Sequence, residues 1–272
     1  MNRGLLRLTG PQRVWFLQQT ITADVEDMPD GTWRESAFLT PKGKLLSHFR
    51  VGVLGEEVWL DIDPPADTLA DWLIKYRFRT KVEIEDRSGA VRTFLGPGAE
   101  AIAGPGVVTT LGEGLAFGDR LGDVPIVIVH GVVDVGLDPA DPDELERARI
   151  EAGVASFGID YTTDHLPQEA GLTRVVPIDK GCYVGQETVA RIHFRGHVNR
   201  SVRGLRLAGP AAVGDALLLD GERIGAITSV AGAAGIGMVR VEPPEGTHVQ
   251  VDGGGTATLG RVPEGTKVKT NP

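Results

Sequence analysis

Lys180-Gly181-Cys182-Tyr183-Val184-Gly185-Gln186-Glu187 is the stretch that decides how this chain is interpreted, and it holds the only cysteine in the sequence. Glycines on both sides of Cys182 let the backbone approach a ligand closely and adopt conformations that other residues avoid. A neighbouring ammonium, such as that of Lys180, would favour the nucleophilic thiolate form. Cys182 is therefore a candidate nucleophile or redox-sensitive thiol. The alternative is that this lone cysteine is a small buried apolar side chain.

Basic residues gather directly after this stretch. The segment Arg191-Ile192-His193-Phe194-Arg195 alternates polar and apolar residues, which predicts a strand with its basic side chains on one face. The basic character continues at His197, Arg200 and Arg203. Arginines bind carboxylates through paired hydrogen bonds, so this segment is a candidate site for a ligand carboxylate. A solvated strand face with no ligand is the alternative.

A second candidate binding group lies upstream, in Pro167-Gln168-Glu169-Ala170-Gly171-Leu172. A carboxylate in a partly buried pocket accepts two hydrogen bonds from an aminopyrimidine edge, as a pterin ring requires. Taken alone, this fragment is unremarkable.

The composition is that of an ordinary globular protein. The chain has 272 residues, 41% of them hydrophobic and 24% charged, which predicts a substantial core divided into two or more lobes. A net charge of -9 opposes general binding to nucleic acid. The N-terminus lacks the apolar core of a signal peptide, and no apolar run is long enough to span a membrane. We therefore expect a cytoplasmic monomer that binds neither nucleic acid nor membranes.

A single cysteine also limits what the chain can hold. It forms no internal disulfide, and a bound iron-sulfur cluster or structural zinc normally needs several thiolate or imidazole ligands. The sequence therefore predicts a protein without a metal site.

Hydrophobic periodicity predicts an α+β chain. We expect a domain boundary near residue 200, with residues 1–200 forming two interleaved α+β lobes and residues 201–272 a small β-barrel. The stretch 82–130 is predicted to be β-rich without a long helix. The other predicted elements are helices at 12–19, 66–76 and from Pro142, a hairpin formed by 33–39 and 45–53, and a strand at 58–62.

The order of three blocks resembles the YgfZ family of folate-binding proteins, within the wider superfamily of the glycine-cleavage T-protein. These blocks are Arg149-Ile150-Glu151-Ala152-Gly153, the segment 167–172 and the specific stretch 180–187. N-terminal blocks support the resemblance, so that it covers most of the chain outside residues 90 to 140. They are Leu8-Thr9-Gly10-Pro11, Phe16-Leu17-Gln18, Thr22-Ala23-Asp24-Val25, Phe38-Leu39-Thr40-Pro41-Lys42-Gly43-Lys44 and Tyr76-Arg77-Phe78-Arg79.

This resemblance implies a three-lobed T-protein-like fold with a C-terminal β-barrel and a pocket for tetrahydrofolate or a one-carbon derivative. It also implies a role in assembling or repairing iron-sulfur clusters in client enzymes. Glu169 matches the carboxylate that holds the pterin ring, and Arg200 or Arg203 falls near the arginine that meets the folate glutamate. Positions that match the signature itself are Lys180, Cys182, Gln186 and Glu187. We add Arg191 to the predicted folate contacts, and we name Cys182 and Lys180 as the candidate catalytic pair.

One departure from the T-protein pattern bears on activity. True aminomethyltransferases carry an aspartate just after the glycine turn of the first lobe, where this chain reads Gly43-Lys44-Leu45-Leu46-Ser47-His48-Phe49. Ser47 or His48 occupies that place, so the acidic group expected for aminomethyl transfer is missing. This departure argues against aminomethyl transfer, while folate binding is still expected from the resemblance. The alternative function is a folate-dependent aminomethyl- or methyltransferase that uses another acid or base, such as His48.

Overall fold

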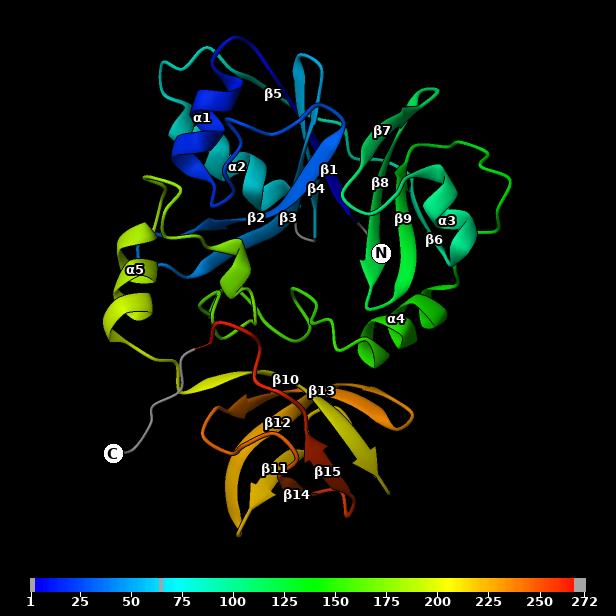
Figure 1. The fold of residues 1–272 in the computed structure, drawn as a ribbon, viewed down its shortest axis with the longest axis vertical. Helices are drawn as coiled ribbons and strands as arrows, with labels where there is room; N and C mark the ends of the chain where they lie inside the picture. Colours follow the sequence, from blue (N-terminus) through cyan, green and yellow to red (C-terminus); the bar gives the residue numbers. More distant parts are fainter. Residues whose placement is uncertain (1–2, 64–65, 267–272) are drawn as a thin grey trace. The chain divides into compact units, whose positions relative to one another are not determined.

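A computed structural model describes residues 3–63 and 66–266 of the chain (Figure 1). The chain divides into two compact units, one formed by Met1–Leu145 with Pro177–Gln186 and the other by Glu146–Val176 with Glu187–Pro272. Each unit is described by itself below.

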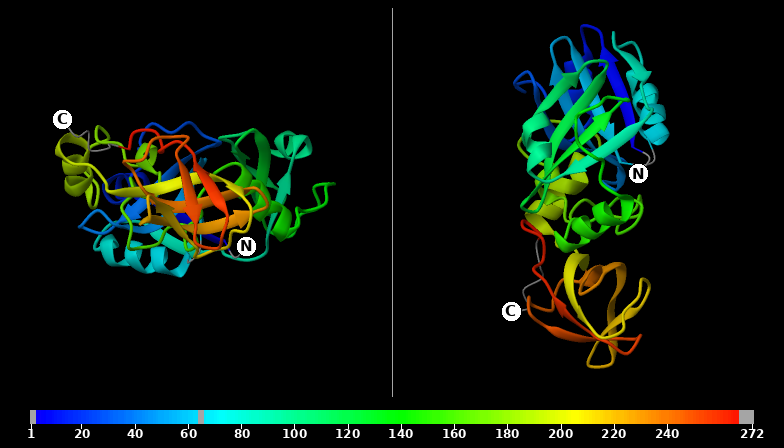
Figure 2. Two further views of the ribbon diagram at one scale, coloured as in Figure 1. Left: turned by 90° about the horizontal axis from the view of Figure 1, so that it is seen from below. Right: turned by 90° about the vertical axis from the view of Figure 1, so that its right-hand side faces the viewer.

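A five-stranded antiparallel sheet forms the first part of unit one, with the strand order β2-β3-β4-β1-β5. Helix α2 covers one face of this sheet, as Figures 1 and 2 show. The strands and helices of this part are β1 (Gly4–Thr9), α1 (Arg13–Thr20), β2 (Thr32–Leu39), β3 (Leu45–Leu54), β4 (Glu57–Ile62), α2 (Ala66–Arg77) and β5 (Glu83–Asp86).

Alternation of apolar residues explains this sheet. Along β3 the residues from Leu45 to Val51 are alternately buried and half-buried, so one face packs on the helices and the other stays closer to water. The predicted hairpin of β2 and β3 is confirmed, and Gly43 supplies the left-handed conformation, with φ of 76°, that its turn requires. Leu69 and Leu73 of α2 are buried in the core, which confirms the predicted amphipathic helix.

A four-stranded sheet forms the second part of unit one, with the order β6-β9-β8-β7. It is built from β6 (Val91–Leu95), α3 (Pro97–Ile102), β7 (Val108–Leu111), β8 (Gly114–Leu121) and β9 (Val124–His130). The prediction of a β-rich stretch without a long helix is confirmed, because α3 has only six residues.

A buried ionic network joins the two sheets of unit one. Asp61, at the end of β4, accepts hydrogen bonds at 2.8 Å from the guanidinium groups of Arg3 and Arg50 and from Nε2 of His130. Arg50 reaches across to Asp119 on the four-stranded sheet, at 2.9 Å from its Nε. Burial alone would raise the pKa of Asp61, but the charges of Arg3 and Arg50 and the hydrogen bond from His130 hold it well below its ordinary value. Asp61 therefore stays ionised in the interior.

Unit two contains a closed six-stranded barrel with the order β10-β13-β12-β11-β14-β15 (Figure 1; right-hand view of Figure 2). This confirms the predicted C-terminal barrel, whose core includes Leu217, Ile227 and Val239. Its strands are β10 (Arg200–Ala208), β11 (Ala216–Leu219), β12 (Glu222–Ala231), β13 (Ala234–Arg240), β14 (His248–Val251) and β15 (Thr256–Leu259). Three further elements precede the barrel in the chain: α4 (Pro142–Glu151), the short 3-10 helix η1 (Thr173–Val175) and α5 (Gln186–Arg195).

The predicted strand at 191–195 is wrong, because these residues lie in α5. Five alternating residues are too few to separate a strand from a helix. In the helix Arg191 and Arg195 are four residues apart and still share a face, whereas His193 points elsewhere. Glu187 in the first turn and basic residues in the last turn complement the helix dipole.

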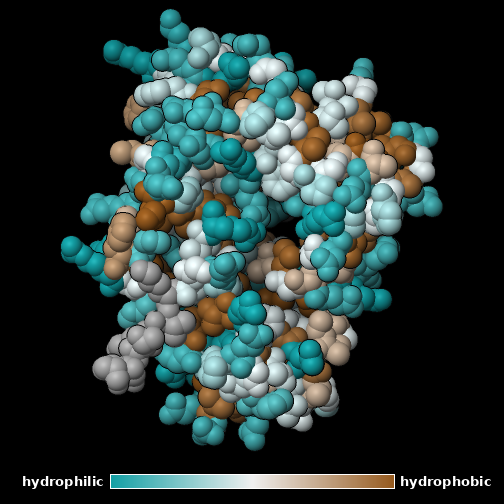
Figure 3. Space-filling model, in the orientation of Figure 1, coloured by the Kyte–Doolittle hydropathy of each residue, from teal (hydrophilic) through white to brown (hydrophobic). Residues whose placement is uncertain are grey.

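On the face shown in Figure 3, most of the surface is hydrophilic, and hydrophobic residues form separate groups among the hydrophilic ones. No helix within residues 3–63 and 66–266 is long and apolar enough to cross a membrane.

Candidate functional site

The signature stretch lies against the first hairpin of unit one. Gly185 has φ of 85°, and a Cβ atom there would meet the carbonyl oxygen of Thr40 at 2.5 Å and the Cβ of Leu39 at 3.0 Å. Only glycine satisfies both the conformation and the contact. Two blocks that are far apart in the sequence, 38–44 and 180–187, are therefore packed together.

Cys182 is exposed on this stretch. The alternative that it is a buried apolar side chain is therefore wrong. Gly181 beside it has φ of 102°, and a Cβ there would have no neighbour within 4 Å. The thiol is thus presented on a segment whose glycines leave it sterically open to a reaction partner.

The ammonium of Lys180 points back into unit one. Its Nζ donates a hydrogen bond to the carbonyl oxygen of Ile21 and lies 5.6 Å from the ring centroid of Tyr183. Burial lowers the pKa of Lys180 to about 8, although the charges on Asp24 and Glu26 act to raise it. Lys180 can therefore exchange a proton close to neutral pH, and it ties the signature to the connection after α1.

Tyr183 anchors the signature from its other side. Its side chain is buried, and its hydroxyl donates to the carbonyl oxygen of Pro177 at 3.0 Å. Burial raises the pKa of this phenol, so it stays neutral and remains a donor. The signature is therefore held at Lys180, Tyr183 and Gly185, while Cys182 lies exposed between the first two.

Glu169 and Arg200, two of the predicted folate contacts, are in direct contact in unit two. Nε of Arg200 donates to Oε1 of Glu169 at 3.0 Å, and the amide of Leu166 donates to Oε2 at 2.9 Å. The Glu169 side chain is 14% exposed, whereas that of Arg200 is 49% exposed. The carboxylate is thus fixed in a mostly buried position by one charged and one neutral donor.

The Glu169 carboxylate fits the aminopyrimidine edge of a pterin. An ionised carboxylate has about four lone-pair sites, and these two hydrogen bonds occupy two of them. The remaining sites suffice for the two N–H donors of an aminopyrimidine. Arg200 is bonded to this carboxylate, so its predicted contact with the glutamate tail of a folate stays a prediction.

His165 borders this pair. Burial lowers its pKa, and the neighbouring charge of Arg200 acts in the same direction. Its Nδ1 accepts a hydrogen bond from the amide of Thr162 at 3.0 Å, which fixes the ring. Sequence reasoning missed His165, since a single histidine four residues before Glu169 carries no motif.

Arg203 is placed differently from Arg200. Its side chain is buried in the barrel, where Nη1 donates to the carbonyl oxygen of Pro243 at 2.6 Å and Nε donates to that of Gly260 at 2.9 Å. These bonds join β10 to segments 40 and 57 residues away in the sequence. The side chain is therefore used to hold the barrel, and its predicted contact with folate has no support from these bonds.

The remaining predicted contacts lie on α5. Gln186 begins this helix and is half-buried, whereas Glu187 and Arg191 are exposed. Glu187 and Arg191 are four residues apart and so share one face of the helix. This face offers both a carboxylate and a guanidinium to a ligand.

Two carboxylates flank His48. Its Nδ1 lies 3.6 Å from Oδ2 of Asp63, and its Nε2 lies 3.7 Å from Oε1 of Glu35. Burial alone would raise the pKa of Asp63, but Arg3 and His48 hold it well below its ordinary value. Neighbouring Ser47 is buried. The sequence showed no acid in the glycine turn, yet the fold brings Glu35 and Asp63 to this place from neighbouring strands.

Comparisons with known proteins give several relatives over most of the chain. It is 30% identical to a tRNA-modifying protein YgfZ of Serratia proteamaculans, over 84% of this chain and 77% of that protein. It is 29% identical to an iron-sulfur cluster assembly factor IBA57 homolog, mitochondrial, of Mycosarcoma maydis, over 79% of this chain. It is 26% identical to a putative chloroplastic transferase of Arabidopsis thaliana, over 84% of this chain. The chain spans 59% of the Mycosarcoma protein and 60% of the Arabidopsis protein.

The fold matches a solved structure. Glycine cleavage system aminomethyltransferase T from Bartonella henselae superposes with a TM-score of 0.83, covering 98% of this chain and 86% of that chain at 21% identity. The predicted T-protein-like fold is therefore confirmed. No model of a protein family matches the chain. The identity to the Serratia protein over most of both chains is nevertheless sufficient, and the chain belongs to the YgfZ family.

Proposed function

We propose that this protein binds tetrahydrofolate or a one-carbon derivative and supports the assembly or repair of iron-sulfur clusters in client enzymes, with Cys182 as its functional thiol. Membership of the YgfZ family supports the proposal, and the Mycosarcoma relative is named an iron-sulfur cluster assembly factor. The observation that carries the folate half is the fixed, mostly buried carboxylate of Glu169.

In this proposal Glu169 accepts hydrogen bonds from the pterin ring, and Arg200 orients the carboxylate. Arg191, with Gln186 and Glu187 on the same helix, is the proposed contact for the rest of the ligand. A bound reduced folate would supply a carrier for one-carbon units. Lys180 holds the signature in place and can exchange a proton close to neutral pH.

Titration with tetrahydrofolate under anaerobic conditions tests the folate half. Loss of a charged hydrogen-bond partner costs about 1.5–3 kcal/mol, so we expect Glu169→Ala to bind roughly 10- to 100-fold more weakly than the wild type. The control is Glu151→Ala, which removes an exposed carboxylate of the same unit. If the wild type does not bind any reduced folate, the folate half is wrong.

The thiol half needs a separate assay. The wild type should accelerate the recovery of a purified [4Fe–4S] dehydratase that has been inactivated by oxidation. Because Cys182 is exposed, Cys182→Ser leaves the packing intact and should reduce recovery to the rate without added protein. Full recovery with Cys182→Ser would show that the thiol has no part in this function.

A second candidate function is a folate-dependent aminomethyl- or methyltransferase. The observation in its favour is His48 between the carboxylates of Glu35 and Asp63, an arrangement suited to acid-base catalysis. Incubation with 5,10-methylene-tetrahydrofolate and candidate amines should then show folate turnover that His48→Gln abolishes. A flat progress curve with the wild type would exclude this candidate for the amines used.

The proposal also covers the domain boundaries, the oligomeric state and the cellular location of the protein. We assign residues 1–200 to the folate-binding region and residues 201–272 to the barrel domain, of which 267–272 lie outside the described residues. We further propose that the protein acts as a cytoplasmic monomer. Size-exclusion chromatography with light scattering would detect a dimer and so contradict the monomer.

A further inference from the structure

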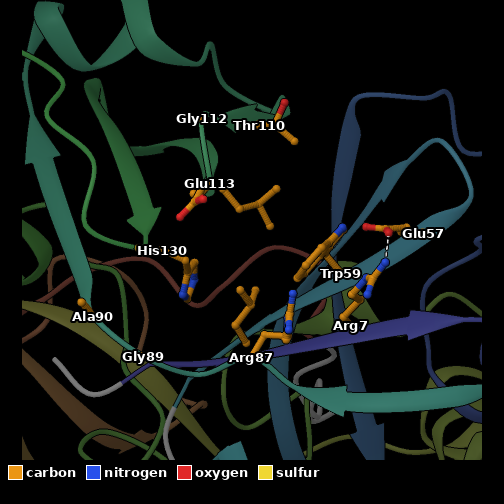
Figure 4. A pocket seen from close by; sticks show the side chains of 14 residues that line it. Arg7, Glu57, Trp59, Arg87, Gly89, Ala90, Thr110, Gly112, Glu113 and His130 are labelled. Atoms are coloured by element: carbon orange, nitrogen blue, oxygen red, sulfur yellow. Dashed lines mark hydrogen bonds and ion pairs between the residues drawn. The ribbon is translucent and has the colours of Figure 1, made fainter.

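Unit one contains a pocket between its two sheets that none of the predicted site residues lines (Figure 4). Its volume is about 420 Å³, within the range typical of small-molecule sites. Strands β1 and β4 and the connection after β5 form one side, while the β7–β8 hairpin and the end of β9 form the other.

The apolar part of the wall is formed by Leu5, Trp59 and Leu115. These residues belong to a hydrophobic cluster that extends beneath the pocket. Figure 4 shows the Trp59 ring on the side of the five-stranded sheet, facing the residues of the four-stranded sheet across the open space. This wall can bury an aliphatic or aromatic group of a ligand.

The ring of His130 lines the opposite side. The His130 side chain is 3% exposed, and its Nε2 is hydrogen-bonded to the ionised carboxylate of Asp61 at 2.8 Å. Within residues 3–63 and 66–266, Nδ1 has no hydrogen-bond partner and is itself buried. This ring therefore closes the wall of the pocket and is held in place by Asp61.

Two arginines and two glutamates line the pocket: Arg7, Arg87, Glu57 and Glu113. Arg7 is already paired with Glu57 and Glu85. Arg87, half-exposed, has a weak ion pair with Glu85 at 4.0 Å, which leaves its guanidinium fork open to a carboxylate. Glu113 stands on the side of His130 and has no ion-pair partner within the described part of the chain (Figure 4).

We propose that this pocket binds a free α-amino acid with an apolar or aromatic side chain. Its carboxylate pairs with Arg87, and its ammonium pairs with Glu113. Its side chain packs against Trp59 and Leu115. An anion without an ammonium would meet Glu113 unfavourably, and a cation without a carboxylate would leave Arg87 unpaired.

Calorimetric titration of the full chain with L-phenylalanine tests this inference. We expect binding with a dissociation constant of about 1 mM or tighter. Arg87→Gln and Glu113→Gln should each weaken it at least about tenfold, a loss of ~1.4 kcal/mol. The matched controls are Arg120→Gln and Glu100→Gln, which break an exposed ion pair of 2.8 Å in the same unit outside the pocket and should bind like the wild type.

Two analogues test the zwitterion requirement. 3-Phenylpropanoate lacks the ammonium and 2-phenylethylamine lacks the carboxylate, so each should bind at least about tenfold more weakly than L-phenylalanine. Equal binding of either analogue would overturn the assignment. So would the absence of binding by L-phenylalanine, L-leucine and L-tryptophan at about 10 mM. Tetrahydrofolate affinity should be the same in Arg87→Gln as in the wild type, which separates this site from the proposed function.

Discussion

Arg200 and Glu169 form an ion pair of 3.0 Å in which the carboxylate is mostly buried and the guanidinium is half-exposed. The two residues were expected to hold different ends of a folate, yet they are bonded to each other. The pair therefore acts as one unit, in which Arg200 orients the Glu169 carboxylate.

This relationship predicts an indirect effect of Arg200. Arg200→Gln should weaken tetrahydrofolate binding by about three- to tenfold, less than Glu169→Ala, because it removes the orienting donor and leaves the acceptor. Calorimetric titration measures the change. Arg206→Gln, an exposed arginine of the same strand, is the control and should leave the affinity unchanged. An Arg200→Gln variant that binds as tightly as the wild type would show that Glu169 needs no orientation from it.

Gly185 and Gly181 should respond differently to substitution by alanine. Both have positive φ, which costs about 1–3 kcal/mol for a non-glycine residue, but only Gly185 would also clash with the backbone of the first hairpin. We expect Gly185→Ala to lower the free energy of unfolding by clearly more than Gly181→Ala does. Urea unfolding followed by circular dichroism measures both. Equal losses would mean that the signature does not pack on the hairpin in solution.

Lys180 should titrate close to neutral pH. Burial lowers its pKa to about 8 from an ordinary value of 10.5, so the folded state binds the proton less tightly than the unfolded state. Its contribution to stability therefore improves as pH rises from about 8 to 10.5, the window in which the unfolded chain alone keeps the proton. After reductive ¹³C-methylation, one methyl-lysine resonance should titrate with a midpoint near 8 and be absent in Lys180→Arg. A spectrum without such a resonance contradicts the burial of this ammonium.

Asp61 should dominate the acid sensitivity of unit one. Its pKa lies well below the ordinary value of 3.8, so the ionised form stabilises the fold at neutral pH. This stability is lost as pH falls below about 3.8 toward the depressed value. Asp61→Asn leaves buried arginines uncompensated and should cost about 3–5 kcal/mol at pH 7.

The control for this variant is Asp123→Asn, an exposed carboxylate of the same unit. It should change the free energy of unfolding by less than about 0.5 kcal/mol. If Asp61→Asn unfolds at the same urea concentration as the wild type, the network does not stabilise the protein.

Local patterns predicted much of the fold. The first hairpin, helices α2 and α4 and the barrel follow from hydrophobic period and turn residues, which act over a few residues. Residues 191–195 were predicted to be a strand because five of them alternate between polar and apolar side chains, a run too short to separate a strand from a helix. Val189 and Ile192, three residues apart, with Glu187 at the start and basic residues at the end, carried the helical signal.

The site was predicted less completely, because its geometry depends on distant residues. Cys182 and Glu169 were found from their motifs. Two of the partners of Asp61, Arg3 and His130, are 58 and 69 residues away. Glu35 and Asp63 meet His48 only through strand pairing. Arg200 and Arg203 look equivalent in the sequence, since only the fold shows that one reaches Glu169 and the other is buried in the barrel.

A structure of the protein with bound tetrahydrofolate tests the central claim most directly. We expect the aminopyrimidine edge of the pterin to lie within about 3 Å of the Glu169 carboxylate, with the Arg200–Glu169 ion pair intact. A pterin ring bound elsewhere, with Glu169 making only its bonds to Arg200 and Leu166, would contradict it.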